Sequence, residues 1–126
     1  MHELSIAVRL VDLAAERAAE LGGAGPAGIR VDAVHVRLGA LAGVAEEALR
    51  FSFEVACRGT PLDGARLVVE RVPVAVSCAA CGAERVLDDP FRFRCPVCGG
   101  PATGVVRGRE IELTALEVEE HVAAHR

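Results

Sequence analysis

Two copies of a Cys-x-x-Cys-Gly motif constrain the fold of this chain more than any other feature. They are Cys78-Ala79-Ala80-Cys81-Gly82 and Cys95-Pro96-Val97-Cys98-Gly99. In each copy, two thiolates three positions apart can chelate one ion, and the glycine permits the tight turn that directs backbone amides at sulfur. The intervening residues 82–94 are enough for a hairpin that brings the four sulfurs into a tetrahedron. We therefore expect a single metal site with sulfur ligands only.

Four thiolates without an open coordination position suit zinc or iron, and they leave no place for a catalytic water. We favour a structural zinc ion, because nothing around the motif indicates a redox enzyme. Iron of the rubredoxin type is the alternative, which spectroscopy distinguishes. The fifth cysteine, Cys57, has no partner at chelating spacing and is predicted to be a small buried apolar side chain.

Composition limits the remaining possibilities. The 126 residues are 52% hydrophobic, which allows one modest core and a small appended module. Aromatic residues make up only 3% of the chain and its net charge is −4, so a nucleic-acid surface is disfavoured. The start at His2 and Glu3 lacks the basic residues of a secretory signal, and no apolar run approaches the roughly 18 residues of a membrane span. We expect a cytoplasmic protein with no membrane partner, whose paired cysteines bind metal.

Hydrophobic periodicity predicts two helices. The first has apolar residues at helical spacing and is expected to end at Gly22-Gly23; these residues are Leu4, Ala7, Val11, Ala14, Ala18 and Leu21. The second runs from about Val44 to Arg58, with its glutamates gathered on one side.

Three segments are typical of strands. Residues 29–38 are rich in valine, and their alternation changes phase around Ala33 and Val34, which indicates a bulge. Residues 65–76 alternate as a strand whose Pro73 requires an edge position or a break. Residues 109–118 resume the alternation after the cysteines.

These elements predict an α+β fold: a mixed three-stranded sheet with two helices, plus an inserted small module like a zinc ribbon. In the simplest topology the last strand returns to the first sheet. The expected domains are residues 1–76 with 105–126, and a zinc-binding module of residues 77–104.

The N-terminus offers a second potential metal site. The amine of Met1 and the amide nitrogen and imidazole of His2 can form fused chelate rings around an ion that favours square-planar nitrogen, namely nickel or copper(II). From spacing alone a solvated terminal histidine is the more common outcome.

The ordered set of motifs resembles the HypA/HybF family along essentially the whole chain. The residues that carry the resemblance are Met1-His2-Glu3-Leu4-Ser5, Phe51-Ser52-Phe53-Glu54-Val55, Gly59-Thr60, Leu62-Asp63-Gly64-Ala65, Val72-Pro73 and the doubled Cys-x-x-Cys motif. The combination of a terminal Met-His-Glu with the cysteine module is specific.

The resemblance implies a nickel metallochaperone that delivers Ni(II) for the maturation of [NiFe]-hydrogenase, working with the GTPase HypB on a hydrogenase large-subunit precursor. In some organisms family members also serve urease. It assigns nickel to His2 with the Met1 amine, with Glu3 as an associated acidic residue. It assigns zinc to Cys78, Cys81, Cys95 and Cys98.

The resemblance leaves several points open. Some family members place a further acidic side chain near the nickel from the loop before the second helix, where this chain has Ala45, Glu46 and Glu47, and neither glutamate takes that role on sequence alone. The fourth nickel ligand and the oligomeric state, with a homodimer as one option, are also open.

The main rival from another class is a zinc-ribbon module that binds nucleic acid or protein. Its phosphate contacts would be Arg85, Arg92, Arg94, Arg107 and Arg109. The net negative charge of the chain instead favours arginines that are exposed to solvent or that contact a protein partner.

An enzyme is not expected. The sequence shows no pairing of nucleophile and base, and His35 in a strand is more often a packing residue than a catalyst. His121 and His125 are spaced for metal binding on a helix, yet in a polar tail they are more commonly solvated.

Overall fold

The computed structural model describes residues 3–21 and 29–119 of the chain. Over these residues the elements follow in the order α1 (Glu3–Glu20), β1 (Arg30–Gly39), α2 (Glu46–Cys57), β2 (Arg66–Val72), β3 (Ala75–Cys78), β4 (Ala83–Val86), β5 (Gly104–Arg107) and β6 (Ile111–Glu119). No helix among them is long and apolar enough to cross a membrane.

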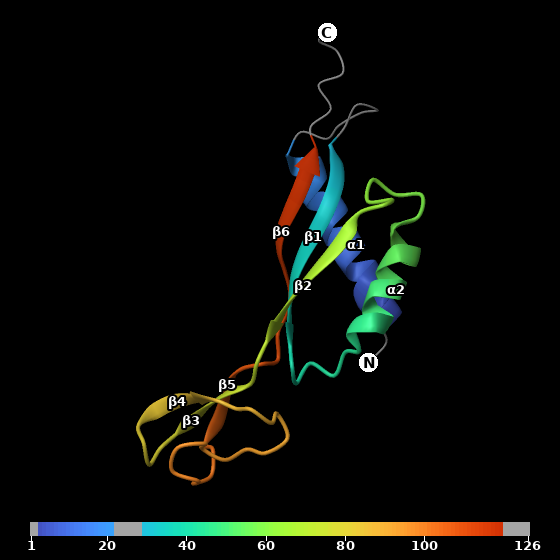
Figure 1. The fold of residues 1–126 in the computed structure, drawn as a ribbon. Coiled ribbons are helices and arrows are strands. Elements are labelled where there is room, and N and C mark those ends of the chain that lie inside the picture. Colours follow the sequence, from blue (N-terminus) through green and yellow to red (C-terminus); the bar gives the residue numbers. More distant parts are fainter. Residues whose placement is uncertain (1–2, 22–28, 120–126) are drawn as a thin grey trace. The chain divides into compact units, whose positions relative to one another are not determined.

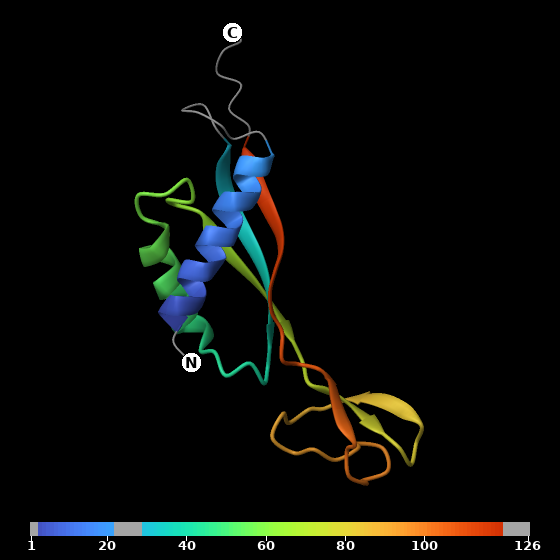
Figure 2. The same ribbon diagram turned by 180° about the vertical axis from the view of Figure 1, so that it is seen from behind.

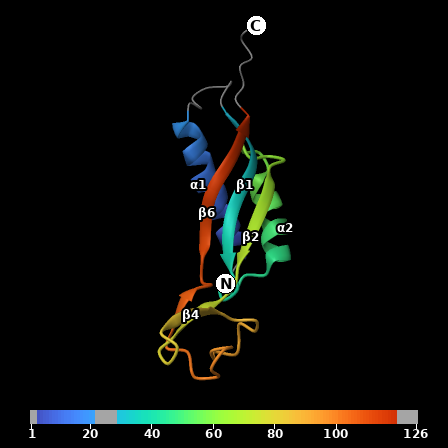
Figure 3. The ribbon, with the colours of Figure 1, turned by 60° about the vertical axis from the view of Figure 1, so that its left-hand side comes forward.

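The first sheet contains three strands in the order β2-β1-β6. Strands β1 and β2 run in the same direction and β6 runs opposite to them, with β1 in the centre (Figures 1 and 3). The last strand therefore returns to the first sheet after the cysteine segment. This confirms the predicted mixed three-stranded sheet and its topology.

Helices α1 and α2 cover one face of this sheet and pack against each other (Figure 2). The buried face of α1 consists of Ala7, Leu10, Val11, Ala14 and Ala18, and that of α2 consists of Leu49, Phe53 and Cys57. Small side chains on α1 allow a close approach between the layers. Leu4 and Leu21, expected on the buried face, are instead 52% and 56% exposed, because they lie at the ends of the helix.

Strand β1 shows the predicted change of phase. Val31 and Ala33 are buried at alternate positions, and burial then continues through Val34, Val36 and Leu38. Two consecutive residues, Ala33 and Val34, are therefore buried, and His35 and Arg37 alternate with the later buried set as half-buried residues.

Pro73 interrupts the segment that follows β2. It separates β2, an edge strand of the first sheet, from β3, the central strand of a second antiparallel sheet with the order β4-β3-β5. Both alternatives expected for this proline, an edge and a break, are met. The sequence did not predict the second sheet, whose short strands offer too little alternation to detect.

The chain divides into two compact units. Among the described residues, the first comprises 3–21, 29–36, 44–69 and 113–119, and the second comprises 37–43 and 70–112. The core of the second unit contains Val74, Val76 and Leu87, with Ala40, Leu41, Ala102 and Val105 packed against it. The expected zinc-binding module, residues 77–104, is shorter than this second unit. That this shorter segment depends on zinc for its folding stays a prediction.

Two glycines let the ends of β1 and β6 meet in the second unit. The backbone N–H of Gly39 donates to the carbonyl of Glu110 at 2.7 Å, and that of Leu41 donates to the carbonyl of Gly108 at 2.7 Å. A Cβ atom at Gly39 would lie 2.2 Å from the Gly108 backbone, and Gly108 itself has a φ of 120°. Only glycine permits this approach without moving the backbone.

Candidate metal centre

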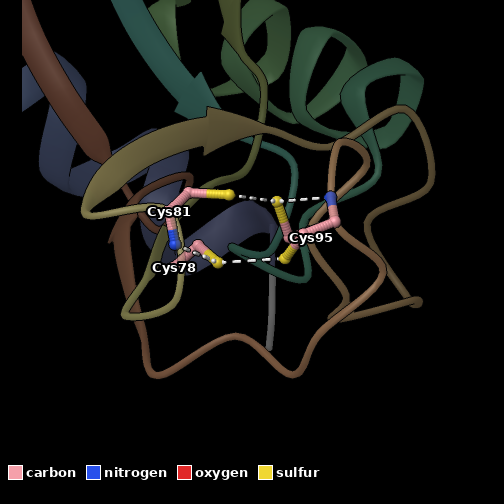
Figure 4. Close-up of side chains that lie close together, drawn as sticks. Cys78, Cys81 and Cys95 are labelled. Carbon is pink, nitrogen blue, oxygen red and sulfur yellow. Dashed lines mark hydrogen bonds between the residues drawn. The ribbon is translucent and has the colours of Figure 1, made fainter.

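The two Cys-x-x-Cys motifs meet at one end of the second sheet. Cys78 ends β3 and Cys81 lies in the turn before β4, while Cys95 and Cys98 lie in the long connection from β4 to β5. Their four sulfur atoms all lie within 4.8 Å of one another. Figure 4 shows the side chains of Cys78, Cys81 and Cys95 converging, with their sulfurs facing a common centre.

Each motif forms the same turn. The N–H of Gly82 donates to the carbonyl of Cys78 at 2.8 Å, and the N–H of Gly99 donates to the carbonyl of Cys95 at 2.8 Å. Gly82 has a φ of 66° and Gly99 a φ of 74°, in the left-handed region that favours glycine. This backbone conformation explains why each motif has a glycine directly after its second cysteine, as predicted.

Backbone amides in these turns point at sulfur. The N–H of Cys81 donates to Cys78 Sγ at 3.4 Å, and the N–H of Cys98 donates to Cys95 Sγ at 3.5 Å. The bond from the Cys98 amide is the first of several hydrogen bonds that lower the pKa of Cys95 to about 6, which favours its thiolate form. Thiolates are the form that binds metal.

The geometry fits a tetrahedral ion. Cys78 Sγ lies 3.5 Å from Cys98 Sγ, and Cys81 Sγ lies 3.8 Å from Cys95 Sγ. A disulfide requires about 2.05 Å, whereas zinc–sulfur bonds of about 2.3 Å at tetrahedral angles place sulfurs about 3.8 Å apart. Four soft donors with no carboxylate or histidine among them suit a structural zinc ion and leave no vacancy for catalysis.

One further polar side chain of the second sheet is partly buried. Arg85, in β4, has a buried Nε atom without a hydrogen-bond partner, although an arginine on a short surface strand is ordinarily solvated. Sequence reasoning placed Arg85 among candidate phosphate contacts. The signal that could have found its inward orientation is its position two residues after Ala83 and two before Leu87, on one face of an extended segment.

The N-terminal nickel ligands expected from the sequence, Met1 and His2, lie outside the described residues, as do His121 and His125. Glu3 is the first residue of α1, and its Oε2 atom accepts a hydrogen bond of 3.1 Å from the backbone N–H of Ala45. Sequence reasoning assigned Glu3 only an association with nickel. The structure gives this carboxylate a backbone partner immediately before α2.

His35 has a cross-strand contact. Its Nε2 atom lies 2.6 Å from Oε2 of Glu117 in β6, and Arg66 of β2 contacts the same carboxylate at 3.2 Å. The hydrogen bond with His35, followed by the charge of Arg66, lowers the pKa of Glu117. This group links all three strands of the first sheet.

Comparison with known proteins gives a consistent result. Residues 1–118 match the family model described as hydrogenase/urease nickel incorporation, metallochaperone, hypA. A hydrogenase maturation factor HypA from Chloroflexus aurantiacus is 55% identical over 117 residues, covering 93% of this chain and 98% of that protein. The HypA of Streptomyces avermitilis is 41% identical over 120 residues, covering 95% of this chain and 88% of that protein.

The fold also has a counterpart among solved structures. The solution structure of the Ni metallochaperone HypA from Helicobacter pylori superposes with a TM-score of 0.65, covering 94% of this chain and 97% of that one at 21% identity. This likeness concerns the arrangement of helices and strands.

Proposed function

Because this chain belongs to the HypA family of metallochaperones for nickel incorporation into hydrogenase and urease, we propose that it binds Ni(II) at its own N-terminus and delivers it for [NiFe]-hydrogenase maturation. The observation that carries this proposal is the family match over residues 1–118, which includes Met1 and His2. Delivery to urease is a second outcome that the family description allows.

The proposed nickel ligands are the Met1 amine, the His2 amide nitrogen and the His2 imidazole. The Glu3 amide or another donor fills the fourth planar position. Nitrogen donors in a plane suit nickel, and the backbone amides must lose protons to bind it. Zinc does not favour this geometry, so the two ions are directed to different sites by donor type.

The fixed position of Glu3 supports a defined nickel site. Its carboxylate accepts a hydrogen bond from the Ala45 amide, which fixes the start of α1. The proposed ligands directly precede this fixed residue. The proposed ligands need only the terminus and one side chain, so nickel can pass to an acceptor without opening the packed core.

The zinc ion in this proposal is bound by Cys78, Cys81, Cys95 and Cys98. Its role is structural, since the described residues of the second unit bury few large apolar side chains besides Val74, Val76 and Leu87. Zinc binding then supplies folding free energy, on the order of 10 kcal/mol in comparable small sites.

The proposed partners are the GTPase HypB and a hydrogenase large-subunit precursor. Glu47 and Glu54 are exposed on α2 and offer an acidic docking surface, whereas Glu46 contacts Arg50 at 3.0 Å. We propose no catalytic role and no nucleic-acid partner, and a cytoplasmic location stays a prediction.

The experiment is a measurement of bound nickel and zinc in untagged protein after nickel addition and gel filtration. The wild type should hold one nickel and one zinc per chain, and His2→Ala should lose the nickel while keeping the zinc. Matched controls are His35→Ala and the double change His121→Ala with His125→Ala, which should keep both metals. Nickel retained by His2→Ala with wild-type affinity would refute the proposed delivery site.

A further inference from the structure

Arg85 occupies an inward-facing position of the second sheet. In the antiparallel pairing of β3 with β4, Val76 lies opposite Arg85 and Cys78 lies opposite Ala83. Residues directly opposite in such a pair project to the same face, as do residues two apart in one strand. The side chain of Arg85 therefore extends on the face that carries Cys78 and the buried Val76.

The neighbours of Arg85 confirm this alternation. Glu84 and Val86, the second and fourth residues of β4, are exposed, whereas Ala83 and Arg85 are half-buried. Glu84 pairs across the sheet with Arg107 at 2.9 Å. The outer face of this sheet thus carries an ordinary surface ion pair, and the inner face carries an arginine.

The guanidinium of Arg85 has no conventional partner on this face. Its Nε atom is buried without a hydrogen bond, and no carboxylate in the part of the chain that the structure describes lies within ion-pair distance of it. Arginine keeps its charge under all ordinary conditions, so an inward position requires nearby negative charge. Cys78, one member of the cluster of four sulfurs, lies on this same face and is a source of negative charge when ionised.

We propose that Arg85 is a positioning residue of the zinc site, whose guanidinium donates N–H groups to the sulfurs of Cys81 and Cys95 and offsets the charge of the metal-bound thiolates. A divalent ion with four thiolates carries two net negative charges, which a buried site must balance. Outer hydrogen bonds of this kind orient ligands and retain the metal.

The electrostatics agree with this geometry. Hydrogen bonding to Cys81, and then to Cys95, raises the pKa of Arg85 above its ordinary value. The two sulfurs come from different Cys-x-x-Cys motifs, so one planar side chain joins both halves of the site. A lysine would supply the positive charge but not the planar set of N–H donors that a guanidinium offers.

The position of Arg85 is also relevant to the alternative that the module binds nucleic acid. Of the arginines considered as phosphate contacts, Arg85 faces the sulfurs, Arg107 pairs with Glu84, and Arg94 donates to the carbonyl of Gly99 at 3.2 Å. Two of the five potential contacts thus have other partners in the second unit, and a third, Arg85, lies on the inner face of its sheet.

The test compares Arg85→Gln and Arg85→Lys with Arg107→Gln, which removes the same charge from the opposite face of the same sheet. Zinc affinity is measured by competition with a chromophoric chelator at fixed pH. Arg85→Gln should weaken zinc binding by about 10-fold or more, as loss of an outer-shell partner does. Arg107→Gln removes only a surface ion pair and should bind zinc nearly as the wild type does.

Cobalt substitution separates a bond to sulfur from a general effect on folding. A hydrogen bond lowers the energy of sulfur lone pairs, so its loss should move the thiolate-to-cobalt charge-transfer band of Arg85→Gln to longer wavelength. Arg85→Lys, which keeps the charge, should recover part of the zinc affinity. The inference is overturned if Arg85→Gln and Arg107→Gln have the same zinc affinity, or if both Arg85 variants keep the wild-type band position.

This inference rests on zinc bound by the four cysteines, and the wild-type protein tests that premise separately. Wild type that binds cobalt without thiolate charge-transfer bands would refute the ligand set itself. The nickel content of the Arg85 variants should match the wild type, because the proposed nickel donors belong to the N-terminus. Failure of the Arg85 inference is therefore distinguishable from failure of the proposed delivery function.

Discussion

The carboxylate of Glu3 accepts a hydrogen bond from the backbone N–H of Ala45, with 3.1 Å between Oε2 and nitrogen. Glu3 begins α1, and Ala45 is the residue that precedes α2. Ala45 itself offers no side-chain cap to α2. A side chain next to the proposed nickel ligands therefore connects the start of the first helix to the start of the second.

Replacement of Glu3 should separate this structural role from any direct role in nickel binding. Glu3→Gln keeps an oxygen acceptor for the Ala45 amide, whereas Glu3→Ala removes it. We expect Glu3→Ala to lower the free energy of unfolding by about 1 kcal/mol and Glu3→Gln to lower it less, as measured by denaturant titration. Because the Glu3 amide survives in both variants, both should still bind one nickel. Loss of nickel in Glu3→Gln would show that the carboxylate is itself a ligand.

Nickel binding should strengthen as pH rises. The proposed site uses backbone amide nitrogens, which must release protons to coordinate, and a neutral imidazole and amine. Isothermal titration at several pH values should show a rising affinity together with proton release in buffers of different ionisation enthalpy. An extra N-terminal residue removes the free amine from its chelating position and should abolish the binding. A pH-independent affinity would exclude amide ligation.

Removal of a zinc ligand should affect the two compact units differently. Cys95→Ala deletes one of the four clustered sulfurs, from a residue that is 2% exposed, so zinc should be lost and the second sheet should loosen. The helices α1 and α2 and the first sheet have their own core and should stay folded. Amide NMR would show collapsed dispersion for residues of β3 to β5 with little change in α1. Cys57→Ala, a buried cysteine of the other unit, is the control and should retain zinc.

The predicted fold followed from patterns that depend on local chemistry. The helix of residues 4–21, the phase change at Ala33 and the interruption at Pro73 each have a steric or periodic cause that a sequence displays. The return of β6 to the first sheet was predictable because the intervening segment has its own metal-binding motif. The ends of α1 were less predictable, since exposure of Leu4 and Leu21 depends on where the sheet stops supporting the helix.

The site was predictable in its ligands and not in its surroundings. The four cysteines fall in two Cys-x-x-Cys pairs, so their spacing alone indicates a shared ion. The inward orientation of Arg85 depends on the register of β3 with β4, and the contact of Glu3 with Ala45 joins residues 42 positions apart. Pairings of this kind arise from tertiary packing, which a single sequence does not display.

Cys57 should be unreactive in the folded protein, despite being a free thiol. It is 2% exposed, and burial together with the charge of Asp63 raises its pKa from 9.0 to about 11. Alkylation needs the thiolate, so iodoacetamide at pH 8 should leave Cys57 unmodified in folded, zinc-loaded protein. Mass spectrometry should find it modified only after a denaturant is added.

The same shift predicts a loss of stability at alkaline pH. Between the unfolded pKa near 9.0 and the folded value of about 11, the unfolded thiol releases its proton while the folded thiol retains it. The unfolded state then binds fewer protons, so the free energy of unfolding contributed by Cys57 is fully present below pH 9 and falls as pH rises toward 11. Cys57→Ala should be less stable at pH 8 because of the cavity, yet it should lack this part of the decline. Denaturant titrations of the two proteins at pH 8 and pH 10.5 should therefore show a smaller difference at the higher pH, and an unchanged difference would mean that Cys57 ionises normally when folded.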